Sequence, residues 1–215
     1  MTFSTAEDFL ARARARLFPV DEPFEDGPRG DHDLSPSLKG MHPEQAQLAA
    51  VLIALRPTGD DYGVQLTLRP DTMAQHAGQV AFPGGRLDPL DGTLLDAALR
   101  ESEEEIGLRR GQVEILGRSR GYLTGTGYLI APFVGLIDHA FEPVPEPGEV
   151  ADVFETPLSF LMNPANHERH TAFWKGRDRE YFAMPHNGRY IWGATAGMLR
   201  ALYERLYAEP QGATD

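Results

Sequence analysis

The chain has 215 residues and a mass of 23.8 kDa, enough for one well-packed domain with room for an additional arm. Its formal net charge of −12 argues against indiscriminate nucleic-acid binding, and the absence of cysteine excludes disulfides, thiolate metal sites and cysteine nucleophiles. The longest uninterrupted apolar run, Leu48 to Leu55, is too short to cross a bilayer, and the N-terminus lacks a signal-peptide pattern. We therefore expect a cytoplasmic protein that binds neither nucleic acid nor membranes.

The N-terminal segment differs in pattern from the rest of the chain. Ser4 and Glu7 have the spacing of a capping box, which predicts a helix at the start. Residues 19–37 are rich in Pro, Gly and Asp, which predicts an extended connection. We therefore divide the chain into an N-terminal helix with an extended arm, residues 1–37, and a main domain, residues 38–215.

Short apolar runs alternate with turn signals through the main domain. The runs "LAAVLIAL" and "YGVQLTLRP" flank the turn residues "RPTGDD", which predicts a hairpin. Strands on both sides of a central helix, with helices near both ends, indicate an α/β fold with layers around a sheet. Beyond the hairpin we expect helices at 93–106 and 194–208 and strands at 113–116, 129–136, 150–155, 171–174, 181–183 and 190–192.

The helix expected at residues 94–106, which Gly107 ends, carries an unfavourable charge pattern in its last turn. Glu101, Glu104 and Glu105 share one face, where like charges at i and i+4 cost roughly 0.2–0.5 kcal/mol. Acids at this end also oppose the helix dipole, at roughly 0.3–1 kcal/mol each. A solvated acidic face is one explanation. The other is a site for a hard divalent cation, which would cancel both penalties.

Two segments carry a family resemblance. The chain reads "FPGG" at residues 82–85 and "RESEEEIGL" at residues 100–108. Together they resemble the signature of the Nudix hydrolases, although Ser102 holds a position that is usually apolar. A second departure is Gly92, which stands where the signature has a glutamate eight residues before the arginine. Asp91 lies one residue earlier, so the segment between the glycines and the arginine is one residue longer than usual.

The longer spacing and the stretch "LTLRPDTMAQHAGQVAFPGG" (residues 66–85) resemble one subfamily, the coenzyme A pyrophosphatases. Later segments, such as "GYLTGTGYLIAPFVG" and "YIWGATAGML", also resemble that group. The resemblance covers roughly residues 48–202 and leaves the N-terminal arm outside it. It implies a Nudix-type α/β/α sandwich with a mixed sheet.

The resemblance also implies a metal-dependent reaction using Mg²⁺ or Mn²⁺. Glu101, Glu104 and Glu105 would be the metal carboxylates, and Arg100 would orient Glu101 through a hydrogen bond. The general base stays open among Glu101, Glu146 and Glu149. The residues expected to contact the substrate are Arg69, His76, Gly84, Gly85 and Arg86.

For the subfamily, the implied substrate is coenzyme A or acyl-CoA, and the products are 3′,5′-ADP and 4′-phosphopantetheine or its acyl form. The 3′-phosphate requires a cationic contact, for which the sequence offers Arg69, Arg86, Lys175 and Arg189. We expect Trp192 in the core rather than at the ligand, and a mobile turn at residues 124–127.

Other functions stay open at this stage. An enzyme of the same fold could act on ADP-ribose, a dinucleotide or a nucleoside triphosphate. A Nudix-like module could sense a nucleotide without cleaving it, although the intact Arg100, Glu101, Glu104 and Glu105 argue against that. A plain acidic metal-binding module would not need the Pro-Gly-Gly loop. The N-terminal arm is a candidate surface for a homodimer.

Overall fold

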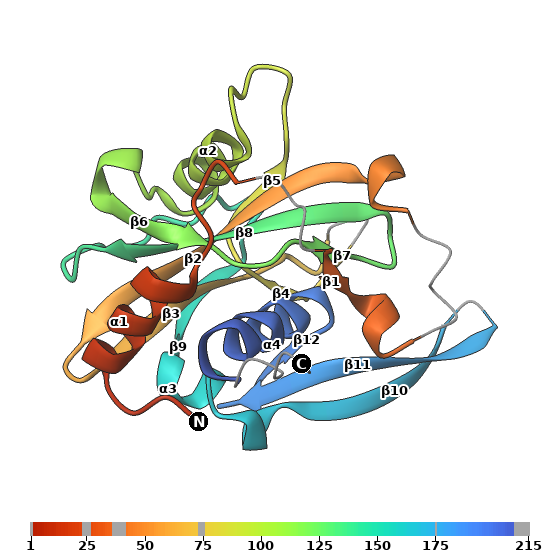
Figure 1. Ribbon diagram of the computed structural model, residues 1–215. Coiled ribbons are helices and arrows are strands. Elements are labelled where there is room, and N and C mark those ends of the chain that lie inside the picture. The colour runs from red at the N-terminus through yellow and green to blue at the C-terminus, as the bar shows by residue number, and fades with distance from the viewer. Residues whose placement is uncertain (1, 23–26, 36–41, 73–75, 175, 209–215) are drawn as a thin grey trace.

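The computed structural model describes residues 2–22, 27–35, 42–72, 76–174 and 176–208. Within them, nine strands form one mixed sheet with helices on both faces, so the expected α/β class is confirmed (Figure 1). The strands are β1 (Arg29–Gly30), β2 (Gln47–Thr58), β3 (Asp61–Leu68), β4 (Val80–Ala81), β5 (Gly84–Arg86), β6 (Val113–Arg118), β7 (Tyr122–Leu123), β8 (Tyr128–Ile137) and β9 (Asp152–Pro157). The order is β1-β7-β8-β2-β3-β4, with β5 beside β2, β6 beside β8 and β9 beside β3.

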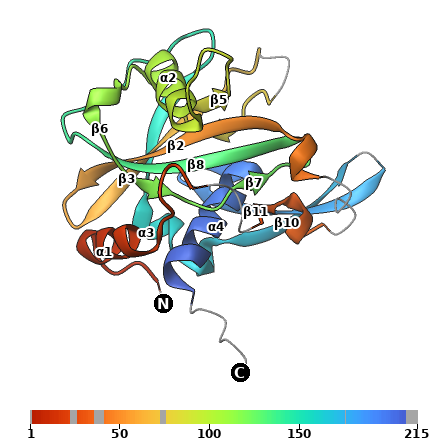
Figure 2. The ribbon, with the colours of Figure 1, turned by 45° about the horizontal axis from the view of Figure 1, so that its top comes forward.

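The central strand β2 is buried on both faces, which explains its continuous apolar run. It pairs with β8 in parallel and with β3 through the expected hairpin. Leu52 and Ala54 face the helix α2 (Leu94–Ile106), whereas Ile53 and Leu55 face the opposite cluster. In Figure 2, α2 lies on one side of the sheet and the C-terminal helix α4 (Ala194–Tyr207) on the other.

The first helix, α1 (Ala6–Arg16), begins one residue later than expected. Thr5, not Ser4, is its N-cap, and the Thr5 hydroxyl accepts a hydrogen bond from the backbone N–H of Asp8 at 3.1 Å. Serine and threonine are both common N-caps, so sequence alone did not separate these neighbours.

Helix α1 is part of the core rather than a detached arm. Phe9 and Ala13 are fully buried in the cluster that also contains the residues of α4. The Phe9 ring lies 5.8 Å from the ring of Tyr62 on β3. The homodimer expected through the N-terminal arm stays a prediction. The domain boundary after residue 37, which lies outside the described residues, stays a prediction.

A second sheet has three antiparallel strands: β10 (Glu168–Trp174), β11 (Arg177–His186) and β12 (Arg189–Trp192). It lies on the same side of the main sheet as α4 (Figure 1). Met184 and Ile191 on one face are buried in the cluster around α4. The short helix α3 (Leu158–Leu161) leads into this sheet.

Residues 27–35, here called the strap, contain β1, the strand at one edge of the main sheet. We expected an extended connection there, but β1 pairs in parallel with β7, and a 3₁₀ turn follows at Asp31–Asp33. None of the helices in the described part of the chain is long and apolar enough to span a membrane.

Most expected elements are confirmed with shifted ends. Strands β6, β8 and β11 extend beyond their predicted limits, and β9 begins two residues later than expected. The pattern did not reveal β1, β4, β5 and β7, which have two or three residues each. Strands this short have no measurable periodicity.

Candidate active site

Two glutamates of α2 meet a third from a distant loop. Ligand oxygens of Glu101, Glu105 and Glu149 all lie within 4.8 Å of one another. Glu101 and Glu105 share a helix face because they are one turn apart. Glu105 is only 4% exposed, whereas Glu149 is exposed. Three carboxylates this close repel one another strongly unless a proton or a cation neutralises them.

The loop that carries Glu149 is attached to the C-terminal end of α2. The backbone N–H groups of Val144 and Glu146 donate to the carbonyls of Ile106 and Glu105, at 2.9 Å each. The last carbonyls of a helix have no partner inside the helix, so the loop satisfies two of them. The same hydrogen bonds bring Glu149 back to the acidic face of α2.

The glycines of β5 permit the close approach of sheet and helix. The backbone N–H of Gly84 donates to Glu105 at 3.2 Å. A Cβ atom on Gly85 would lie 2.4 Å from the carboxyl carbon of Glu101, and one on Gly84 would lie 2.3 Å from the carbonyl oxygen of Ala50. Gly84 also has φ of 153°. Gly84 therefore requires glycine, and a side chain at Gly85 would displace the Glu101 carboxylate.

Burial changes the acidity of the two helix carboxyls. It raises the pKa of Glu105 to about 8, although the Gly84 N–H opposes the shift. Burial also raises the pKa of Glu101, and a hydrogen bond from Arg100 opposes it. Three clustered carboxylates supply the oxygen ligands that Mg²⁺ and Mn²⁺ prefer, and a bound cation would displace the proton of Glu105. The residues therefore fit a hard divalent cation.

Arg100 donates to five oxygen atoms, one of which is the carbonyl of Arg86 at 3.3 Å. It makes two parallel 3.0 Å contacts with Asp91, whose side chain is 5% exposed, and 2.9 Å contacts with Glu101 and Glu104. The contact with Glu101 is the one expected from the sequence. Asp91 is the residue that sequence reasoning missed as a functional group, because Gly92 occupies the usual acidic position. The single-residue extension before α2 was the signal for it.

Two predicted acids lie outside the carboxylate cluster. Glu104 is 57% exposed and turns to Arg100. The carboxylate of Glu146 accepts from the N–H of Gly148 at 3.3 Å within its own loop. A metal role for Glu104 and a base role for Glu146 stay predictions.

A cavity of about 370 Å³, here called the cleft, opens beside the glycines. It lies between the main sheet, on Ala49 and Val51, and the start of α4, on Ala194, Thr195 and Met198. Its walls include all five residues expected to contact substrate: Arg69, His76, Gly84, Gly85 and Arg86.

Arg69 and His76 reach the cleft from one turn. The backbone of Arg69 pairs with Gly78 and Gln79, and the His76 ring bonds the Gln79 side chain at 2.8 Å. The Nε of Arg69 is buried without a hydrogen-bond partner among the described residues. Its charge lowers the pKa of Glu105, so it lies near the acidic cluster. An anionic ligand would satisfy it.

The cleft also contains residues that sequence reasoning did not place there. Asp31 of the strap and Arg179 of β11 line it, although they are separated by 148 positions in the chain. Trp192, which we expected in the core, is half-buried in the wall. The guanidinium of Arg86 lies 5.3 Å from the ring centre of Tyr128.

Arg189, one of the cations considered for the 3′-phosphate, is not among the described residues that line the cleft. Arg189 forms an ion pair with Asp152 and lies over the ring of Phe154 at 4.5 Å. Lys175 lies outside the described residues. Arg69 and Arg86 stay as candidates.

The fold and the site define an α/β protein built on a mixed sheet, with a glutamate-rich helix that carries a candidate site for a divalent cation. The NUDIX domain family matches residues 46–175. A Nudix hydrolase named NudL from Photorhabdus laumondii is 31% identical over 199 residues, 93% of this chain and 96% of the relative. NudL from Yersinia pestis is 35% identical over 160 residues, 74% and 79% of the two chains.

A solved Nudix hydrolase from M. smegmatis, RenU, has a TM-score of 0.50 at 20% identity, covering 78% of this chain and 89% of its own. That likeness concerns the fold alone. The chain belongs to the Nudix hydrolases. It is thus a Nudix pyrophosphohydrolase that acts on a small-molecule substrate, and the family generally needs a divalent metal.

Proposed function

We propose that the enzyme cleaves the diphosphate of coenzyme A or acyl-CoA, giving 3′,5′-ADP and 4′-phosphopantetheine or its acyl form. The main support is one arrangement: Arg69 and His76 line the same cleft as Gly84, Gly85 and Arg86. The first two belong to the stretch that resembles the coenzyme A subfamily, and the last three lie beside the carboxylate cluster.

Glu101 and Glu105 would hold Mg²⁺ or Mn²⁺, with Glu104 as a further candidate, and the carboxylate of Glu149 lies within 4.8 Å of theirs. The bound cation would neutralise the diphosphate oxygens and lower the pKa of the attacking water. Arg100 fixes the carboxylate of Glu101, and Asp91 fixes Arg100 in turn.

Glu149 is the best-placed general base. Oxygens of Glu101 and Glu105 are engaged by Arg100 and by the Gly84 N–H. Among the described residues, no hydrogen bond engages the exposed carboxylate of Glu149, so it can accept a proton from water.

The diphosphate and the 3′-phosphate would be bound by different arginines. Arg69 lies near Glu105 and would contact the diphosphate. Arg86 follows Gly85 directly and lies over Tyr128, so its charge stays at the glycine end of the cleft. With Arg69 on the diphosphate, Arg86 would bind the 3′-phosphate.

The reaction is tested by Mg²⁺-dependent hydrolysis of coenzyme A beside ADP-ribose, NADH and diadenosine polyphosphates. Products are identified by mass spectrometry in ¹⁸O-labelled water, which also identifies the attacked phosphorus. Coenzyme A should be cleaved fastest. Faster cleavage of another compound would leave the active-site assignment standing but refute coenzyme A as the substrate. Nucleotide binding without cleavage would indicate a sensing module.

The arginine assignment is tested by Arg86→Ala. It should lower kcat/KM for coenzyme A about 10- to 100-fold, the range of a charge-assisted contact, and leave dephospho-coenzyme A nearly unchanged. Arg189→Ala is the matched control because Arg189 pairs with Asp152. Equal losses on both substrates would remove Arg86 from this role.

A further inference from the structure

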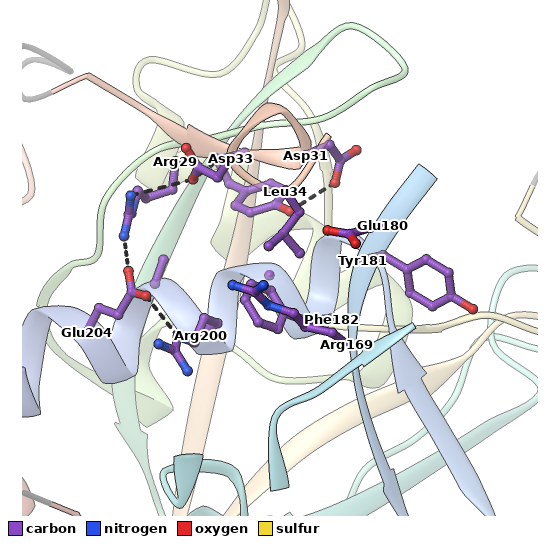
Figure 3. A pocket seen from close by; sticks show the side chains of 14 residues that line it. Arg29, Asp31, Asp33, Leu34, Arg169, Glu180, Tyr181, Phe182, Arg200 and Glu204 are labelled. Atoms are coloured by element: carbon purple, nitrogen blue, oxygen red, sulfur yellow. Dashed lines mark hydrogen bonds and ion pairs between the residues drawn. The ribbon is translucent and has the colours of Figure 1, made fainter. Parts of the chain in front are cut away.

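The strap is held on three sides, which makes it a rigid part of the molecule. β1 pairs with β7, Arg29 forms an ion pair with Glu204 of α4 (Figure 3), and the Ser35 hydroxyl accepts from the N–H of Glu180 at 2.9 Å. Glu180 is the neighbour of a cleft residue, Arg179. The strap therefore fixes the backbone of β11 next to that residue.

One buried carboxylate connects the strap to the end of the cleft. Asp31 has a side chain only 4% exposed, and it accepts hydrogen bonds from the Tyr122 hydroxyl at 2.9 Å and the Gly125 N–H at 2.6 Å. It also forms an ion pair with Arg179. Four elements (strap, β7, the turn at residues 124–127 and β11) thus meet at Asp31, and the position of the Arg179 guanidinium is set by it.

This end of the cleft lies far from the carboxylate cluster. Strands β5, β2, β8, β7 and β1 are successive neighbours, and strands are spaced about 4.8 Å apart, so β1 lies on the order of 19 Å from β5. Gly84 and Gly85 of β5 and Asp31, which follows β1, all line the cleft, so the cleft runs across these strands. A diphosphate held at the cluster does not reach Arg179, so a different part of the ligand meets it.

The length and chemistry of the cleft favour the pantetheine half of coenzyme A, which is the longer of the two halves joined by the diphosphate. Thirteen bonds separate the phosphorus from the sulfur of 4′-phosphopantetheine, about 16 Å at the reach of an extended chain. The adenosine 3′-phosphate half is shorter and carries two more charges. The middle of the cleft is apolar, with Val51, Ile130 and Met198 among its walls. It suits the uncharged pantetheine arm better than a phosphorylated nucleoside.

We propose that Arg179, positioned by Asp31, binds the carboxylate of a coenzyme A thioester whose acyl group ends in a carboxylate. Arg179 is then a specificity-determining residue, and Asp31 is a positioning residue. The inference rests on the coenzyme A function proposed above. A guanidinium already fixed by a carboxylate loses little freedom on binding, and it matches a second carboxylate in a planar, two-contact geometry.

The test compares glutaryl-CoA with valeryl-CoA, which have equal numbers of acyl carbons and differ in the terminal carboxylate. The wild-type enzyme should prefer glutaryl-CoA by about 10- to 100-fold in kcat/KM, mainly through KM. Arg179→Ala should abolish the preference, Arg179→Lys should restore part of it, and Asp31→Asn should reduce it. General damage to the enzyme would lower kcat/KM for both thioesters alike. A change in the ratio of the two kcat/KM values therefore reports the positioning role of Asp31.

Arg169→Ala is the matched control. Arg169 pairs with Phe182 on the face of the three-stranded sheet opposite Arg179, and both line a second cavity of about 210 Å³ near α4, which shares Asp31 with the cleft but not Arg179 (Figure 3). This variant should keep the preference. A wild-type enzyme that treats both thioesters alike, or a preference that survives Arg179→Ala, overturns the inference. Free coenzyme A, assayed in parallel, separates that outcome from failure of the proposed function, which would leave coenzyme A and both thioesters uncleaved.

Discussion

Replacing Glu105 by glutamine gives a direct test of the carboxylate cluster. Glu105 is 4% exposed, and its pKa is raised from an ordinary 4.5 to about 8 in the folded protein. The folded state therefore binds more protons than the unfolded state between these two values. In the absence of metal, the stability of the wild-type protein falls as the pH rises through that interval and levels off above pH 8.

The magnitude follows from the same shift. One differentially bound proton changes the free energy of unfolding by roughly 1.4 kcal/mol per pH unit. Glutamine does not titrate. The free energy of unfolding of Glu105→Gln, relative to that of the wild type, should therefore rise by up to about 3 kcal/mol between about pH 5.5 and 7.5. At the acidic end the two proteins should differ little, because a protonated carboxyl and an amide have similar size and polarity.

Urea denaturation in EDTA, followed by circular dichroism at several pH values, measures this difference. Glu103→Gln is the control, because Glu103 is exposed on the same helix. Mg²⁺ should then stabilise the wild type at pH 7.5 by about 2.7 kcal/mol at 100 times its Kd. Mg²⁺ should stabilise the Glu105→Gln variant much less, and this variant should show no Mg²⁺-dependent turnover. Parallel pH profiles, or equal stabilisation of both proteins by Mg²⁺, would refute the proposed cluster.

Three further variants test separate parts of the structure. Asp91→Asn should lower kcat about 10-fold or more with KM nearly constant in steady-state assays, because Arg100 loses the partner that orients it; a change in KM alone would contradict this. Gly85→Ala should weaken Mg²⁺ activation in a metal titration, because the new methyl group would displace the Glu101 carboxylate; an unchanged titration would show that the helix can yield. Phe9→Ala should lower the free energy of unfolding by about 3–5 kcal/mol in urea; a loss below about 1 kcal/mol would restore the picture of a detachable arm.

Local signals predicted the elements whose causes are local. Helix α2 begins after Thr93, whose hydroxyl accepts from the N–H of Asp96, and ends at Gly107 with φ of 72°, as its capping residues indicate. The acidic face of this helix broke the local rules for charge, and that conflict pointed to the site. The resemblance to the coenzyme A subfamily then implied Arg69 and His76, which line the same cleft in the structure.

The rest of the site depends on contacts between distant positions. Asp31 meets Arg179 across 148 residues, and no pattern near either residue indicates the pairing. Asp91 lies one residue before the position at which the family motif has an acid. Comparison with the motif shows this only as a mismatch at Gly92. Phe9 is buried because β3 offers Tyr62 at the right place, and hydrophobic periodicity cannot identify the partner of a helix face.

The strap has a consequence for the order in which the protein matures during synthesis. Residues 27–35 emerge from the ribosome early, but their partners on β11 and α4 are made more than a hundred residues later. Until then Asp31 lacks Arg179, and the end of the cleft is not assembled. Contacts of such long sequence separation form late and slowly. A nascent or truncated Nudix chain can thus hold the complete glutamate helix while its cleft is still unfinished, so the power to choose a substrate is acquired last.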